Sequence, residues 1–312
     1  MTRRKPMTMT RRHALLAGAT LPLVPAFAPL AHAAADKLGA ATPPFRRYSL
    51  GSFEVTPLLA GTRVQEDPKS IFAGNVPQEE FEAAARAAFL PTDRAQGFFT
   101  PTLVNTGTEL ILFDTGLSQE GILAALDAAG HSADAVDLVV ITHMHGDHIG
   151  GLMEGETPTF ANARYLTGQV ENDHWSAQQN EGYEGKVRPL LEKMSFVAGG
   201  DEAAPGITAV EAFGHTPGHM AWRLESDGQA LMLTADAANH YAFSLGHPDW
   251  EVRFDMDKAA AAATRRALFG QIAEERIPFI GYHMPFPAVG YVETSGDGFR
   301  FVPESYQLML NG

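Results

Sequence analysis

Residues 137–148 read DLVVIT followed by HMHGDH, an apolar run that leads directly into a cluster of histidines. The apolar half predicts a buried strand that ends at the cluster. In the second half, three imidazoles and a carboxylate form a compact set of ligands for a divalent metal ion. Residues i and i+2 of an extended segment share a side, so His143 and His145 can reach one ion, which they could not from a helix. Asp147 and His148 lie past the glycine and can turn toward a second ion, so the segment predicts two metals and hydrolytic chemistry.

Composition narrows the classes of partner. The chain has 312 residues, of which 45% are hydrophobic and 19% charged, an ordinary globular composition with ample material for a core. The formal charge is −14, with no long basic run outside the N-terminus. This argues against a nucleic-acid surface and against stable docking on an anionic membrane. We therefore expect a small-molecule substrate as the partner, and the oligomeric state, a homodimer included, is left open.

The chain has no cysteine, which excludes disulfides, thiolate nucleophiles and cysteine-ligated zinc. Histidine and carboxylate side chains are then the only strong ligands. Three further candidates, His219, Asp236 and His283, each follow an apolar run. Ligands at the ends of several strands that converge on one sheet edge are how a rigid scaffold positions a metal site.

The N-terminus predicts an export signal over residues 1–33. Basic residues precede an apolar stretch over 14–30 that three prolines interrupt, and the AHA at 31–33 is a small-x-small cleavage site. The stretch is a poor membrane span. The TRRHALL at 10–16 resembles the twin-arginine signal, which exports folded proteins and suits a metal loaded beforehand. An ordinary secretory signal is the alternative, and either one predicts a periplasmic or secreted protein.

After a flexible leader at residues 34–47, one domain is predicted over 48–312, built from two sheets with helices outside. Alternation and apolar runs predict strands at 53–59, 102–105, 110–113, 137–141, 207–212, 220–224, 230–234, 278–282, 289–293 and 299–302. Helices are predicted at 79–90, 121–129 and 257–275. The stretches between and after the strand at 53–59 and the helix at 79–90, through residues 96–99, have weak periodicity, and we expect them to form loops or a lid near the site.

These motifs, in this order, resemble the metallo-β-lactamase superfamily in its HxHxDH form with two metals. The resemblance runs from about Tyr48 to Tyr306 and rests on FDTG at 113–116, THMHGDHIGG at 142–151 and HTPGH at 215–219, followed by the two later ligand candidates. It implies an α/β fold of the αββα sandwich type, with the site at one sheet edge.

The resemblance also implies a division of ligands between the two ions. His143, His145 and His219 would hold the first metal, and Asp147, His148 and His283 the second, with Asp236 bridging both. We also expect supporting roles for residues near these ligands. His215 would orient the HTPGH turn, Asp114 would support the ligand loop from behind, and nearby aromatic side chains would line a pocket. The histidines at 131, 174, 240 and 247 are interpreted as structural or solvated.

Two divalent ions, zinc before manganese, cobalt or iron, lower the pKa of a shared water and so supply a bridging hydroxide at neutral pH. Asp147 and Asp236 are the candidates to take up the attacking water's proton. We expect the substrate to be a small lactone or aryl ester, with an organophosphate triester as the alternative. A β-lactamase is less favoured because such enzymes usually differ at the Asp-His pair or use a cysteine ligand. A non-catalytic or di-iron protein is less favoured because di-iron members usually carry a flavin domain.

Within the superfamily, the sequence looks most similar to the methyl parathion hydrolase and dihydrocoumarin-type lactonase branch. The grounds are the export signal, the VNTG at 104–107 and a tail that runs from MPFP at 284–287 to GFRFVP at 298–303. Quorum-quenching lactonases usually carry a tyrosine three residues after the bridging aspartate, where this chain has Asn239. Either Tyr241 substitutes from a longer loop, or acyl-homoserine lactone is not the natural substrate.

Overall fold

The computed structural model describes residues 39–310, so the predicted export signal at 1–33 lies outside the described residues. Contacts divide the chain into Met1–Ala41 and Thr42–Gly312, and the second unit holds every helix and strand of the described part. Paired backbone begins earlier than the sequence suggests. Phe45 forms a bridge with Leu58, within the predicted leader, because the chain there lies along the end of a strand.

The first of two large sheets has the strand order β1-β2-β5-β6-β7-β10-β11. Its strands are β1 Tyr48–Leu50, β2 Phe53–Pro57, β5 Thr102–Asn105, β6 Leu110–Phe113, β7 Leu138–Ile141, β10 Arg164–Gly168 and β11 Met194–Val197. From β6 onward the neighbours are parallel, and helix α3, Gln119–Ala128, makes the crossover to β7. Parallel strands are covered on both faces, which explains why all four residues of β7 are apolar and buried.

The second sheet has the order β12-β13-β14-β15-β16-β17-β18. Its strands are β12 Glu202–Ala204, β13 Ile207–Glu211, β14 Met220–Ser226, β15 Gln229–Ala235, β16 Phe279–Gly281, β17 Val289–Ser295 and β18 Gly298–Pro303. All neighbours are antiparallel except β15 and β16, whose connection contains the long helix α6, Lys258–Glu275. Asp257 caps α6 by accepting the N–H of Ala260, and the helix ends where Arg276 turns left-handed.

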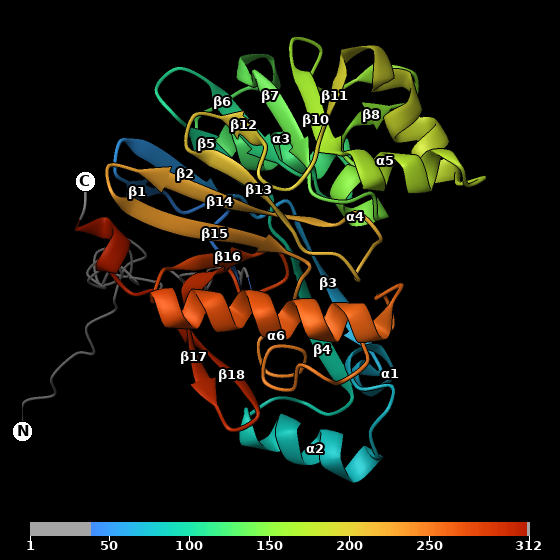
Figure 1. Cartoon of the computed structure of the whole chain (residues 1–312), viewed down its shortest axis with the longest axis vertical. Coiled ribbons are helices and arrows are strands. Elements are labelled where there is room, and N and C mark those ends of the chain that lie inside the picture. The colour runs from blue at the N-terminus through green and yellow to red at the C-terminus, as the bar shows by residue number, and fades with distance from the viewer. Residues whose placement is uncertain (1–38, 311–312) are drawn as a thin grey trace, which may run out of the picture. The chain divides into compact units, whose positions relative to one another are not determined.

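Successive side chains in the strands of the first sheet point into two different cores. On β5, Val104 points into the core between the sheets, where Phe113 and Trp222 meet edge to face at 5.8 Å. Its neighbour Leu103 points the other way, into a core completed by α3 and by α5, Gln169–Ser176. Each large side chain buried this way contributes about 1.5–3 kcal/mol. Helices α3 and α5 lie with the first sheet and α6 with the second, so the predicted αββα sandwich is confirmed (Figure 1).

Outside the sandwich, a two-stranded ribbon pairs β3, Gly61–Glu66, with β4, Arg94–Phe99. The prediction of a loop or lid at 96–99 was wrong, since this segment is the end of β4. The ribbon belongs to neither large sheet, and most of β3 is exposed, so it shows little hydrophobic alternation. Between its strands come α1, Pro68–Phe72, and α2, Gln78–Ala87. Among residues 39–310, no helix is both long and apolar enough to cross a membrane.

Candidate metal centre

The predicted ligands all follow strands of the two large sheets. His143 and His145 come directly after β7, and the one-turn helix α4, Gly146–Ile149, carries Asp147 and His148. The second sheet supplies the others, Asp236 after β15 and His283 after β16, while the HTPGH turn joins β13 to β14. The centre therefore draws side chains from both sheets.

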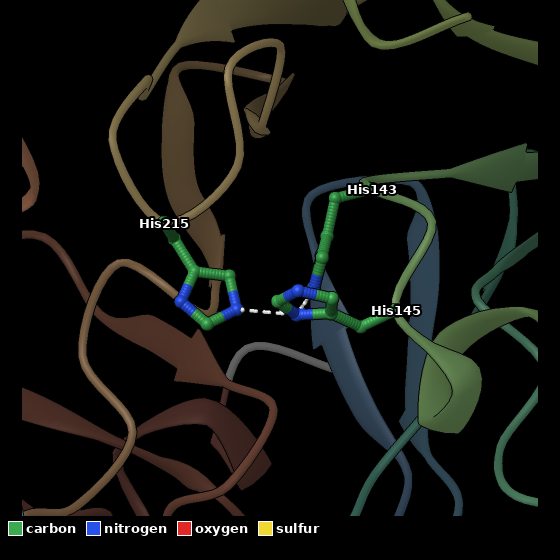
Figure 2. Close-up of side chains that lie close together, drawn as sticks. All are labelled: His143, His145 and His215. Atoms are coloured by element: carbon green, nitrogen blue, oxygen red, sulfur yellow. Dashed lines mark hydrogen bonds between the residues drawn. The ribbon is translucent and has the colours of Figure 1, made fainter. Parts of the chain in front are cut away.

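One group of ring nitrogens comes from three histidines. His145 Nδ1 lies 3.2 Å from His143 Nε2 and 2.9 Å from His215 Nε2, and Figure 2 shows these two contacts as dashed lines. Nitrogens bound tetrahedrally to zinc at about 2.0–2.1 Å lie roughly 3.3 Å apart, close to these distances. Lone pairs that face each other this closely repel unless a proton or a cation lies between them. The three imidazoles thus fit one metal ion.

A second group joins carboxylates to imidazoles. His283 Nε2 lies 3.3 Å from Asp147 Oδ2 and 3.1 Å from Asp236 Oδ2, and the same Asp236 oxygen is 3.2 Å from His215 Nε2. His148 Nε2 and Asp236 Oδ1 are 3.2 Å apart and buried, yet neither has a hydrogen bond within the described part of the chain. Buried polar atoms are nearly always paired, so this orphaned pair fits a cation shared by the two groups. Asp236 lies where a bridging ligand would lie.

The structure brings six of the seven predicted ligands together but leaves His219 outside. His219 Nδ1 bonds to the carbonyl of Ala212 at 3.0 Å, and His219 Nε2 accepts the N–H of Asp236 at 3.0 Å. Both ring nitrogens therefore already have backbone partners. His215 occupies the position expected for His219, although its predicted role was only to orient the turn. The geometry thus favours His215 as the third imidazole ligand and gives His219 the task of supporting the backbone at Asp236.

Three of the inward-facing nitrogens are fixed by a bond that the ring makes on its outer side. His148 Nδ1 donates to Asp114 Oδ2 at 2.9 Å, which confirms the predicted supporting role of Asp114. His283 Nδ1 donates to the Phe98 carbonyl at 2.7 Å. His215 Nδ1 donates to Asp255 Oδ1 at 2.8 Å. These bonds set the tautomer, leaving Nε2 free to ligate.

The charges of the centre suit a cation. Burial, together with the nearby His148, holds the pKa of His143 well below its usual range, and burial and His215 lower the pKa of His145 to about 4. Burial would also lower the pKa of His283, but Asp236 and Asp147 outweigh it and raise that pKa to about 10. Burial opposes ionisation of Asp236 as well, yet His283 and His148 keep its pKa well below normal. The carboxylates are thus ionised and demand positive charge, which a metal ion supplies.

Two cavities open beside the centre. The first, of about 440 Å³, is lined by His145, Asp147, Asp236 and His283 and by polar residues of β3 and β4. The second, of about 470 Å³, has a mostly apolar wall. This wall consists of Val64, Leu90, Pro91, Ala95, Phe98, Tyr241, Phe243 and Pro285, with Arg94 beside them. Some of the aromatic residues expected around the site do line these cavities, whereas Trp175 instead lies edge-on to His145 at 6.1 Å.

Two supporting carboxylates were not predicted. Glu171 of α5 is fully buried and accepts four bonds, from Met144 N, Trp175 Nε1, Thr216 Oγ1 and Gly218 N. Asp255 holds His215 and is itself paired with Arg265 at 2.8 Å. Neither residue lies next to a ligand motif in the sequence, so only the folded chain reveals these contacts.

Comparison with known proteins gives consistent results. The family model described as "Metallo-beta-lactamase superfamily" matches residues 100–278. An N-acyl homoserine lactonase from Bacillus sp is 26% identical over 123 residues, which are 38% of this chain and 46% of the relative. The chain thus spans about half the length of the curated relatives it matches.

Solved structures match over more of the chain. One, titled as AidC, a dizinc quorum-quenching lactonase in complex with its product, has a TM-score of 0.78 and 25% identity, covering 84% of this chain and 98% of that one. Another, the hydrolase AbOPH of the beta lactamase superfamily, has a TM-score of 0.76 and 23% identity, and the match covers 86% of this chain and 100% of that one. At this identity the likeness shows the fold alone. The family model spans more than half of the sequence, and the chain belongs to the metallo-beta-lactamase superfamily.

Proposed function

We propose that the chain is a metal-dependent hydrolase that cleaves a small lactone or a related ester at a two-metal centre. The observation that carries this proposal is the pair of ligand groups that share Asp236 beside an open cavity of about 440 Å³. The lactonases among its relatives support a lactone over a phosphotriester. The dizinc lactonase of similar fold supports zinc, which imidazole and carboxylate ligands also suit.

In this proposal His143, His145 and His215 hold one ion, Asp147, His148 and His283 hold the other, and Asp236 lies between them. When bound, the ions supply Lewis acidity and a water that ionises at neutral pH. The chain's own groups position the ligands and exclude side reactions. Asp114, Asp255 and the Phe98 carbonyl fix the imidazole tautomers.

Asp147 is the better placed of the two predicted proton acceptors. Both carboxylates line the first cavity, but the side chain of Asp147 is 24% exposed, whereas that of Asp236 is 4% exposed and already contacts His215, His283 and Asn239. Zinc is supplied in excess, because the amide of Asp147→Asn would be a weaker ligand than the carboxylate. At full metal content we expect this variant to lose turnover by roughly 10²-fold, as removal of a positioned acid or base does. Zinc content and kcat measured on one preparation check this. Unchanged turnover at full metal content would remove Asp147 from the role.

The cavities also indicate the kind of substrate. Tyr241 lines the apolar cavity and not the one at the centre, so it is poorly placed to replace the tyrosine of other lactonases. Asn239 donates to Asp236 Oδ2 at 2.9 Å and helps to hold the bridging carboxylate. A lactone with an apolar substituent would fit its ring into the first cavity, beside the metal ligands, and its substituent into the second.

A turnover panel tests the proposal. Zinc-replete protein should hydrolyse lactones and aryl esters, lose this activity with a chelator and regain it with zinc. Phosphotriesters and β-lactams are measured in the same panel. If the protein hydrolyses one of them faster than any lactone, that compound class replaces the lactone as the proposed substrate. No hydrolysis of any compound by a protein that holds two zinc ions would contradict the proposal.

We further propose that residues 1–33 export the folded protein to the periplasm or beyond. Cell fractionation of the wild type beside a variant with Arg11→Lys and Arg12→Lys tests this. Retention of the variant inside the cell is the expected result, and equal export of both proteins would favour an ordinary secretory route.

A further inference from the structure

His240 lies at the seam between the two cavities. Its side chain lines both of them, together with Gln96 and His283. The residue is 6% exposed and belongs to the loop that follows β15. Asp147, Asp236 and His145 line only the first cavity, and the apolar wall lines the second.

The imidazole of His240 is held in one orientation. Its Nδ1 accepts the N–H of Ala242 at 3.1 Å and that of Phe243 at 3.3 Å. An acceptor nitrogen carries no proton, so the proton of the neutral ring is on Nε2. The rings of Phe243 and Tyr241 stack on it, with centroids at 4.2 and 4.9 Å. Ser244 Oγ accepts the N–H of His240 at 2.9 Å and closes the loop.

The Nε2–H of His240 has no partner within residues 39–310. Burial lowers the pKa of this histidine to about 3, and no neighbouring charge contributes. The ring is therefore neutral throughout the range in which a hydrolase works, and its N–H is a permanent donor. A donor at the wall of a cavity is available to an acceptor on a ligand, which would replace water there.

Building on the proposed function, we propose that His240 determines substrate specificity by donating a hydrogen bond from Nε2 to an oxygen of the substrate. That oxygen lies between the reacting lactone or ester and an apolar arm. The reacting group then faces Asp147 and His283, and the arm fills the cavity beside Val64 and Leu90. The substrate class is therefore a lactone with a substituent on its ring, in which an acceptor oxygen comes first and an apolar chain follows.

Two lactones that differ only in the substituent test this inference. N-Hexanoyl homoserine lactone carries a substituent with an amide carbonyl and an alkyl chain, and γ-butyrolactone has no substituent on its ring. His240→Phe keeps an aromatic ring in the stack but removes the donor. We expect it to lower kcat/KM for the substituted lactone by about tenfold, mainly through KM, and to leave γ-butyrolactone within about twofold. His240→Gln retains an N–H and should recover part of the loss.

His247→Phe is the matched control, because His247 stacks on Trp250 at 3.9 Å and lines neither cavity. It should leave kcat/KM unchanged for both substrates, and all variants should keep their zinc. His240→Phe also removes the acceptor of two backbone N–H groups, so its melting temperature should fall, and both lactones are compared well below that temperature. Equal losses for both lactones in His240→Phe, or no loss for either, would overturn the inference.

A measurement on the wild type separates this inference from the proposed function. In a long-range 15N spectrum of the zinc-loaded protein, the Nε2–H signal of His240 should shift when N-hexanoyl homoserine is added. No shift at saturating ligand would sink the inference even if lactones are hydrolysed. A shift without turnover of any lactone would retain the binding role of His240 and discard the proposed lactonase.

Discussion

The two histidines of the HTPGH turn lie four residues apart, but their rings have different surroundings. His215 faces two other imidazoles and a carboxylate, whereas His219 has both ring nitrogens bonded to the backbone. His215→Ala should therefore lose one zinc per chain and lower turnover by at least 10²-fold. His219→Ala should keep two zinc ions but lose about 1–3 kcal/mol of stability, because the N–H of Asp236 is left unpaired.

Zinc content, turnover and the free energy of unfolding of the two variants check this assignment. The opposite pattern, with zinc lost from His219→Ala and retained by His215→Ala, would restore the ligand set expected from sequence. Composition and spacing could not decide between the two histidines, because both lie in one short turn. What separates them is the direction of each ring, which Asp255 and the carbonyl of Ala212 fix from elsewhere in the fold.

The burial of His240 also predicts how the free energy of unfolding changes at acid pH. An unfolded histidine titrates near pH 6.5, while burial lowers the pKa of His240 in the folded protein to about 3. As the pH falls below 6.5, the unfolded chain takes up a proton that the folded chain refuses, so stability falls until the pH reaches about 3. The loss can reach about 4 kcal/mol. Unfolding curves of wild type and His240→Phe between pH 7 and 4 test this, and parallel curves would contradict it.

At the scale of elements, the sequence predicts segments whose burial is regular. The strands β5, β6, β7, β13, β14 and β15 were all predicted to within about two residues, because each carries an apolar run or clear alternation. The ribbon β3–β4 and the strands β1, β10, β11 and β12 were not predicted. Residues 94–99 read RAQGFF and residues 164–168 read RYLTG, and neither segment has a period long enough to detect. Their strand character comes from pairing with partners distant in the chain.

Helix α5 contributes more to the centre than its weak pattern suggests. The carboxylate of Glu171 joins two ligand loops, since Oε1 accepts the N–H of Met144 at 2.8 Å and Oε2 accepts Thr216 Oγ1 at 2.7 Å. A Cβ at Gly218 would overlap the backbone of α5, so the turn and the helix are in close contact. The side chain is a positioning residue for His143, His145 and His215.

We therefore expect Glu171→Gln to destabilise the fold by about 2–4 kcal/mol, because an amide N–H would face donors on one side. Zinc affinity should fall by about 10–100-fold, as it does when an outer partner of a ligand is changed. Glu184→Gln, at an exposed carboxylate that pairs with Arg188, is the matched control and should change neither quantity. Competition with a chromogenic chelator measures the affinity. If Glu171→Gln bound zinc as tightly as the wild type, the two ligand loops would keep their geometry without the Glu171 carboxylate.

At the scale of the whole domain, the centre lies where loops of both sheets meet. His143, His145, Asp147 and His148 follow β7 of the first sheet, and Asp236 and His283 follow strands of the second. Metal ions held by both groups would link the loops of the two sheets, and they would bind the folded state, in which the ligands converge. Free zinc at a hundredfold excess over its dissociation constant adds about 2.7 kcal/mol for each site.

Chelation should therefore lower the melting temperature of the protein by about 5–10 °C, at roughly 2 °C for each kcal/mol in a domain of this size. Calorimetry of zinc-loaded, chelated and zinc-restored protein measures the change, and the restored sample should regain its first value. Asp236→Ala removes the carboxylate shared by the two groups, so its melting temperature should respond far less to the chelator. A wild-type melting temperature that ignores chelation would mean that the sheets hold together without the metals, and that the ligand loops form no link between them.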